Sequence, residues 1–175
     1  MRNPVYDAVR TILAVRDFDD RPLPEGLLDR IAQSAHLTAS ASNQQPWHFV
    51  VVREREHLRE LGRLVRTGPY TANAAAAVIV AIEKSASPGL SDASRAIQSM
   101  MLTAWAEGVG SNWTGFGGLE GVRQVFGLPD GYDVLAVVPF GYSKRKLGLG
   151  RKKRKSIGEV VSHETYGTPW KGQTK

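Results

Sequence analysis

Three short apolar runs constrain the fold of this chain more than any other feature of its sequence. They cover residues 48–52, 78–82 and 134–140 and are rich in β-branched side chains. Runs of this length and composition are typical of buried strands. The segments between them have the apolar spacing of helices instead. The sequence therefore predicts one layer of sheet covered by helices, in an α+β or α/β sandwich, without settling the strand order.

Helical spacing of apolar residues is clearest from Ser91 to Gly108, where we expect a long central helix. Asp92 lies near its start, where a carboxylate interacts favourably with the helix dipole. Alanine favours helix, so the alanines from Ala74 onward predict that the second strand starts at Val78. The other expected helices cover residues 3–12, 25–37, 54–65 and 119–126.

Composition excludes several classes of chemistry. The chain of 175 residues has the size of one domain, so we expect a single domain over residues 1–175. It contains no cysteine, which excludes disulfides, thiolate nucleophiles and Cys-ligated metals, so redox chemistry requires a bound cofactor. The four histidines show no metal-ligand spacing, and we expect no metal site. No apolar run approaches the ~20 residues of a spanning helix, so we expect a cytoplasmic protein with no membrane partner.

Positive charge is concentrated near the C-terminus. The net charge is +6, and eight of the 23 cationic residues lie within residues 144–155. Such a run is compatible with a solvated loop, with binding of a small cofactor's phosphate, or with nucleic acid. It has no interleaved aromatic residues to stack on bases, so nucleic acid is the least favoured partner.

Small polar residues gather in Ser40-Ala41-Ser42-Asn43-Gln44-Gln45-Pro46-Trp47, between an expected helix and an expected strand. Amide side chains offer both donors and an acceptor, so Asn43 and Gln45 can match the alternating polar edge of a flavin. A plain turn is the alternative, because Ser, Asn and Pro favour turns for local reasons.

This cluster, followed by Phe49–Val52, resembles the signature of the nitroreductase family: Ala-Pro-Ser, two small residues, Asn, any residue, then Gln-Pro-Trp. Other stretches resemble the family in the same order and extend the match over nearly the whole chain. They are Val15-Arg16-Asp17-Phe18, Asp92 to Ser111, Leu128-Pro129-Asp130-Gly131, Phe140-Gly141-Tyr142, Arg154 to Val161 and Tyr166-Gly167-Thr168-Pro169-Trp170.

The resemblance implies an α+β, three-layer sandwich whose central, mostly antiparallel sheet is covered by helices. It implies a homodimer with FMN in each of two clefts between the subunits. It further implies an oxidoreductase that takes hydride from NAD(P)H and reduces small oxidised acceptors, such as nitroaromatics, quinones or flavins, by a ping-pong mechanism. The flavin performs the chemistry, so no catalytic side chain is expected.

The resemblance also assigns residues to the flavin ring and ribityl chain. Arg16 would lie near flavin N1 and the C2 carbonyl, where reduction leaves negative charge; a surface salt bridge to a neighbouring Asp is the alternative. Ser40, Asn43 and Gln45 would bind the ribityl chain and the pyrimidine edge. Thr114 and Gly115 match the position where backbone N–H groups face flavin N5.

Lys152 and Arg154 match the family's C-terminal phosphate-binding pair. The sequence departs from the family at Ile12-Leu13-Ala14, where many members have Arg-Arg-Ser, so two phosphate contacts are absent. Arg10, or the surplus cations at 151–155, would have to compensate. A different reaction on the same flavin scaffold, and a flavin- or nucleic-acid-binding module without turnover, remain alternatives. The sequence leaves open the physiological acceptor and the choice between NADH and NADPH.

Overall fold

The computed structural model describes residues 3–115, 117–147 and 152–170. Within them, one sheet has the strand order β1-β2-β4-β3, and each pair of neighbours is antiparallel. The expected antiparallel sheet is therefore confirmed. The strands are β1 (Trp47–Val52), β2 (Ala76–Glu83), β3 (Gly110–Ser111) and β4 (Tyr132–Gly141).

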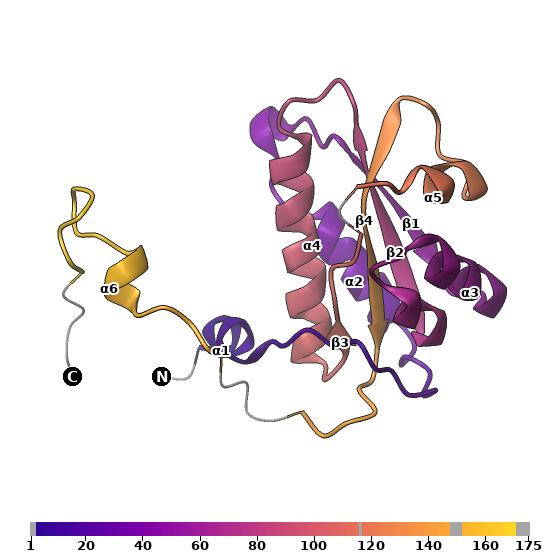
Figure 1. The fold of residues 1–175 in the computed structure, drawn as a ribbon, viewed down its shortest axis with the longest axis horizontal. Coiled ribbons are helices and arrows are strands. Elements are labelled where there is room, and N and C mark those ends of the chain that lie inside the picture. The colour runs from indigo at the N-terminus through magenta and orange to yellow at the C-terminus, as the bar shows by residue number, and fades with distance from the viewer. Residues whose placement is uncertain (1–2, 116, 148–151, 171–175) are drawn as a thin grey trace.

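Helices cover both faces of the sheet, which confirms the three-layer sandwich (Figure 1). Strand β2 shows why its sequence is apolar at consecutive positions. Val78 and Val80 pack with the helices of one face, whereas Ile79 and Ala81 pack with those of the other. A strand buried on both faces cannot alternate polar and apolar residues. One face carries α2 (Leu27–His36) and α4 (Gly89–Ala106), and the other carries α3 (Arg55–Leu64) and α5 (Glu120–Val125).

The expected helices and strands all form, with ends shifted by a few residues. One expectation needs correction, and one short strand was not expected. Strand β2 begins at Ala76 and not at Val78, because Ala77 packs in the buried cluster beneath α3, and this tertiary contact overrides its helix propensity. Strand β3 was not predicted, because a two-residue strand is too short to produce a pattern. Short 3-10 turns cover Ala41–Asn43 and Pro69–Asn73.

The N-terminal segment lies at the C-terminal end of α4. Helix α1 (Pro4–Thr11) is capped by Asn3, whose Oδ1 accepts the Tyr6 N–H at 3.0 Å. Trp105 of α4 donates its indole N–H to Thr11 Oγ1 at 2.9 Å. These contacts fix α1 against the end of α4 that also leads into β3 (Figure 1).

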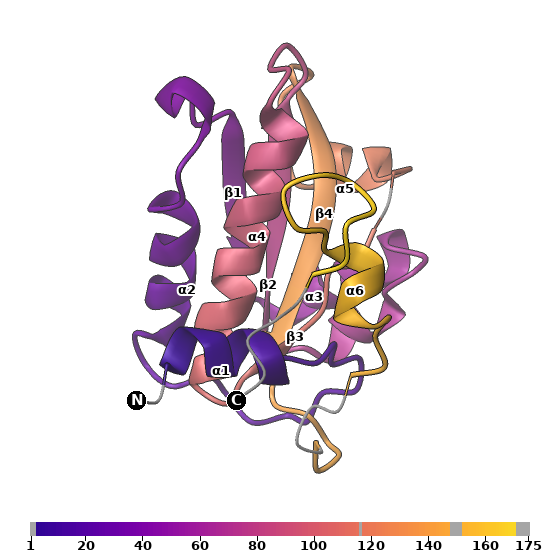
Figure 2. The ribbon, with the colours of Figure 1, turned by 90° about the vertical axis from the view of Figure 1, so that its left-hand side faces the viewer.

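Residues 152–170, here called the C-terminal arm, extend beyond α1 and away from the sheet (Figure 1), and Figure 2 looks onto the side from which they project. The arm contains α6 (Ile157–Val160), which begins with a capping box between Ser156 and Glu159. Hydrogen bonds from the Ser156 side chain and N–H lower the pKa of the Glu159 carboxyl. Val160 and Tyr166 are 65% and 102% exposed. The arm thus leaves apolar surface uncovered in one chain. Across the described ranges, no helix is long and apolar enough to cross a membrane.

Candidate functional site

Residues 40–45, here called the amide loop, join α2 to β1 through an unusual backbone. Ser42, Asn43 and Gln45 have φ values of 49°, 54° and 52°, in the left-handed region that non-glycine residues rarely adopt. The loop is closed on itself: Ser40 Oγ accepts the Gln45 N–H at 2.9 Å, and the Gln45 amide donates to Asn43. The side chains of Asn43 and Gln45 are nevertheless exposed, so both amides are available to a ligand.

The amide loop is fixed at the N-terminal end of α4. The Ala41 N–H donates to Asp92 Oδ2 at 3.0 Å. Just before the loop, the Thr38 hydroxyl hydrogen-bonds with Ser99, also on α4, at 2.8 Å. Pro46, just after it, is buried. The expected ligand residues Ser40, Asn43 and Gln45 therefore share one anchored loop.

Arg16 lies at the opposite end of α4. Its neighbours Val15 and Phe18 are buried in a cluster that also contacts Trp105. The Val15 N–H donates to Ser111 O in β3 at 2.9 Å. A Cβ at Gly110 would lie 2.3 Å from Val15 Cγ2, so a glycine there is required for this approach. The segment is thus fixed, and it leaves Arg16 exposed.

The acids near Arg16 have other partners. Asp17 pairs with Lys144 at 3.8 Å and Arg145 at 3.5 Å. Asp19 pairs with Arg21 at 2.8 Å, and a hydrogen bond from Arg21 lowers the pKa of the Asp19 carboxyl. The alternative of a salt bridge from Arg16 to a neighbouring Asp is therefore not favoured.

Lys152 and Arg154 lie at the root of the C-terminal arm, close to α1. Lys152 Nζ donates to Val9 O at 2.7 Å. Partial burial lowers the pKa of the Lys152 ammonium, and the positive charge of Arg154 lowers this pKa further. Arg154 is exposed and donates to the Lys153 carbonyl at 3.2 Å. The two cations thus lie together near the end of α1, where adding an anion would relieve their mutual repulsion.

The positions of the missing family arginines, and the proposed substitute Arg10, have defined surroundings within the chain. Ile12 and Leu13 are half-buried at the end of α1. Arg10 already pairs with Asp7 within α1, at 3.3 Å. Within one chain, Arg10 therefore has a carboxylate partner and Lys152 has a carbonyl partner.

The backbone N–H groups of Thr114 and Gly115 both have acceptors within the chain. The Thr114 N–H donates to Val137 O in β4 at 3.0 Å, so the sheet already uses this donor. The Gly115 N–H donates to Thr67 Oγ1 at 3.2 Å. Of the two donors expected to face flavin N5, only that of Gly115 can be offered, and Thr67 must then release it. This role of Thr67 has no local sequence signal, because residues 67 and 115 are far apart in the chain.

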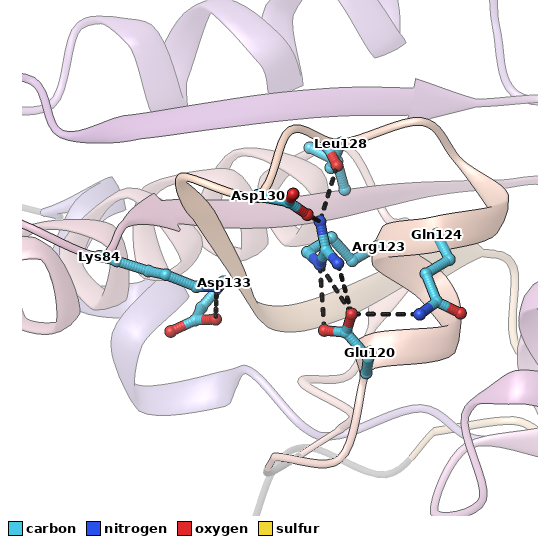
Figure 3. Close-up of polar contacts among 7 residues, drawn as sticks. All are labelled: Lys84, Glu120, Arg123, Gln124, Leu128, Asp130 and Asp133. Carbon is cyan, nitrogen blue, oxygen red and sulfur yellow. Dashed lines mark hydrogen bonds and ion pairs between the residues drawn. The ribbon is translucent and has the colours of Figure 1, made fainter.

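A cleft of about 400 Å³ opens beside Gly115. Its walls are residues 64–67 from the end of α3 and residues 115 and 117–119 before α5. Arg123 fixes α5 by donating to Glu120 at 2.5 Å and to Asp130 (Figure 3). These two hydrogen bonds raise the pKa of the Arg123 guanidinium. The helix after the glycine-rich segment is therefore held in place.

Within one chain, the expected ligand residues form two separate groups. The amide loop contacts Asp92, whereas the segment that carries Arg16 packs near Trp105. These positions on α4 are roughly 20 Å apart along the axis, at about 1.5 Å per residue. Arg16 and Asn43 are both expected at the pyrimidine end of a flavin, but within one chain they lie near opposite ends of α4. The donor types fit FMN, and within one chain they lie in two groups at opposite ends of α4.

Comparisons with known proteins agree with the fold. The family model described as the nitroreductase family matches residues 10–89 and 70–142. The chain belongs to the nitroreductase family. A nitroreductase relative from Methanothermobacter thermautotrophicus, described as an NADH dehydrogenase/NAD(P)H nitroreductase, is 36% identical over 152 residues, which cover 82% of this chain and 80% of the relative.

Solved nitroreductase-type structures share the fold. A Bacteroides thetaiotaomicron protein described as an NADH dehydrogenase/NAD(P)H nitroreductase superposes with a TM-score of 0.87 at 24% identity, covering 95% of this chain and 100% of that one. An FMN-dependent nitroreductase from Clostridium difficile superposes with a TM-score of 0.82 at 22% identity, covering 92% and 99%. The nitroreductase architecture of this chain therefore extends beyond the segments that the family model matches.

Proposed function

We propose that this chain is an FMN-dependent oxidoreductase that uses NAD(P)H to reduce small oxidised organic acceptors, such as nitroaromatics, quinones or flavins. Residues 1–175 would act as one domain within a homodimer. Membership of the nitroreductase family supports this proposal, as do the NAD(P)H-linked description of one relative and the FMN-dependent description of one solved structure.

The separation of the ligand residues into two groups is the observation that carries the proposal. The amide loop of one chain would supply Ser40, Asn43 and Gln45 to the ribityl chain and the pyrimidine edge. The other chain would supply Arg16 to the pyrimidine end, and Lys152 and Arg154 to the phosphate. Each dimer would then contain two equivalent sites, as expected for a symmetric pair.

FMN, when bound, supplies the acceptance of hydride and the transfer of electrons to the acceptor. The residues of this chain bind and orient it. The fixed charge of Arg16 stabilises negative charge at the pyrimidine end. Lys152 and Arg154 neutralise the phosphate through charge-assisted hydrogen bonds. NAD(P)H and the acceptor would occupy the same cleft in turn, which is the basis of the proposed ping-pong order.

Absorbance spectra and steady-state kinetics test this proposal. We expect purified protein, or protein incubated with FMN, to show a flavin band and a higher melting temperature, because ligand that binds the folded state stabilises it. Initial rates with NAD(P)H and a quinone should give parallel double-reciprocal lines. Colourless protein that takes up no added FMN would contradict the proposed cofactor. Intersecting lines would contradict the proposed order.

A further inference from the structure

The backbone of the amide loop is strained, and its internal hydrogen bonds do not attach it to the rest of the protein. Ser42, Asn43 and Gln45 all have positive φ, and none of them is glycine. Such conformations persist only where the surroundings enforce them. The bonds from Gln45 to Ser40 and Asn43 close the loop, but they would survive if the whole loop moved.

Asp92 supplies an attachment from outside the loop. It lies in the first turn of α4, and its side chain is 0% exposed. Oδ2 accepts the Ala41 N–H at 3.0 Å, and Oδ1 pairs with the guanidinium of Arg95. A buried carboxylate is unfavourable unless its oxygens are satisfied. Here Oδ1 pairs with Arg95 in the same helix, and Oδ2 accepts a hydrogen bond from Ala41 in the amide loop.

Capping of α4 does not account for this arrangement. The N-cap of α4 is Pro88, and no side chain caps this helix. The Asp92 N–H donates to Pro88 O, as in ordinary helix backbone. Its carboxylate reaches the N–H of a residue that is distant in sequence, on the loop that carries the ligand amides.

We infer that Asp92 is a positioning residue: its buried carboxylate holds Ala41, and through it the strained backbone that presents Asn43 and Gln45 to the cofactor. Asp92 acts through the loop and does not touch the cofactor itself. The inference rests on the proposed function only for the identity of the ligand. The attachment of the loop is a property of the protein without ligand.

A matched pair of variants isolates the hydrogen bond. Asp92→Asn and Asp92→Leu are both uncharged and branch at the same atom, but only Asn offers an oxygen to the Ala41 N–H. We expect Asp92→Leu, which loses the hydrogen bond from Ala41, to weaken FMN binding at least about tenfold. Asp92→Asn keeps a weaker form of this hydrogen bond, so its FMN Kd should remain within about threefold of wild type. Ser99→Ala removes the Thr38–Ser99 hydrogen bond just before the loop but keeps the bond from Ala41 to Asp92, so it should weaken FMN binding less than Asp92→Leu does. Flavin fluorescence titration gives each Kd.

Hydrogen exchange of the protein without FMN gives a second, independent result. The Ala41 amide should be protected in wild type and in Asp92→Asn, and should exchange faster in Asp92→Leu. If Asp92→Leu does not fold, Asp92→Ala gives the same comparison without the added bulk. Equal FMN Kd values for the Asn and apolar variants, or equal Ala41 exchange in all of them, would overturn the inference. Wild type that binds no FMN would contradict the proposed function, and hydrogen exchange would then decide the role of Asp92.

Discussion

The amide loop and the C-terminal arm both carry expected cofactor contacts, but the fold holds them in opposite ways. The amide loop is fixed to α4 by the buried carboxylate of Asp92. The arm extends from the body and leaves Val160 and Tyr166 exposed. Within one chain, the amide loop is therefore held in place, whereas no surface of that chain covers these arm residues. On this account, a second chain covers the arm and brings the two groups together.

Removing the arm should have the largest effect. Ending the chain after Leu147 removes Lys152, Arg154 and the exposed apolar residues, but it leaves both main buried clusters intact. We expect a folded monomer whose FMN affinity falls roughly a hundredfold or more, since two charge-assisted contacts of about 1.5–3 kcal/mol each are lost. Sedimentation equilibrium and FMN titration measure the two effects. A truncated chain that stays dimeric would show that the arm is not required for association.

Arg154→Ala should have the next largest effect. Loss of one charge-assisted hydrogen bond to the phosphate should weaken FMN binding by about 1.5–3 kcal/mol, on the order of tenfold or more in Kd. Riboflavin lacks the phosphate, so it should bind wild type and variant equally. Lys146→Ala, which removes an exposed cation outside residues 151–155, is the control. Unchanged FMN affinity, together with a salt-dependent DNA affinity that the variant loses, would favour nucleic acid as the ligand of the basic run.

Thr67→Val should change the FMN affinity less than these variants do, and should raise it where they lower it. Thr67 Oγ1 accepts the Gly115 N–H at 3.2 Å, so valine would free this donor at nearly constant volume. If FMN uses the Gly115 N–H, the variant should bind FMN about twofold to tenfold more tightly, the scale of one neutral hydrogen bond. Thr67→Ser keeps the hydroxyl and should match wild type. Weaker binding in Thr67→Val would show instead that the threonine contacts the cofactor directly.

Local patterns account for most of the fold and for part of the site. The strands were predictable because β2 and β4 are buried on both faces, which requires continuous apolar runs. Ser40, Asn43 and Gln45 were found together because they are neighbours in sequence. The roles of Asp92 and Thr67 were not predictable, because each depends on a contact with a residue distant in the chain. The start of β2 at Ala76 was missed for the same reason.

The central claim is that each site combines the amide loop of one chain with Arg16 and Arg154 of another. Two double variants test it: Asn43→Ala with Gln45→Ala, and Arg16→Ala with Arg154→Ala. Each alone should bind FMN weakly. When the two variants are unfolded and refolded together, random pairing should make about half of the dimers mixed. In a symmetric dimer with two shared sites, each mixed dimer has one site with both groups intact and one site with both groups defective. We predict that wild-type FMN affinity returns at roughly one site per four chains. If both groups came from the same chain, every site in the mixture would keep a defect, and no high-affinity binding would return.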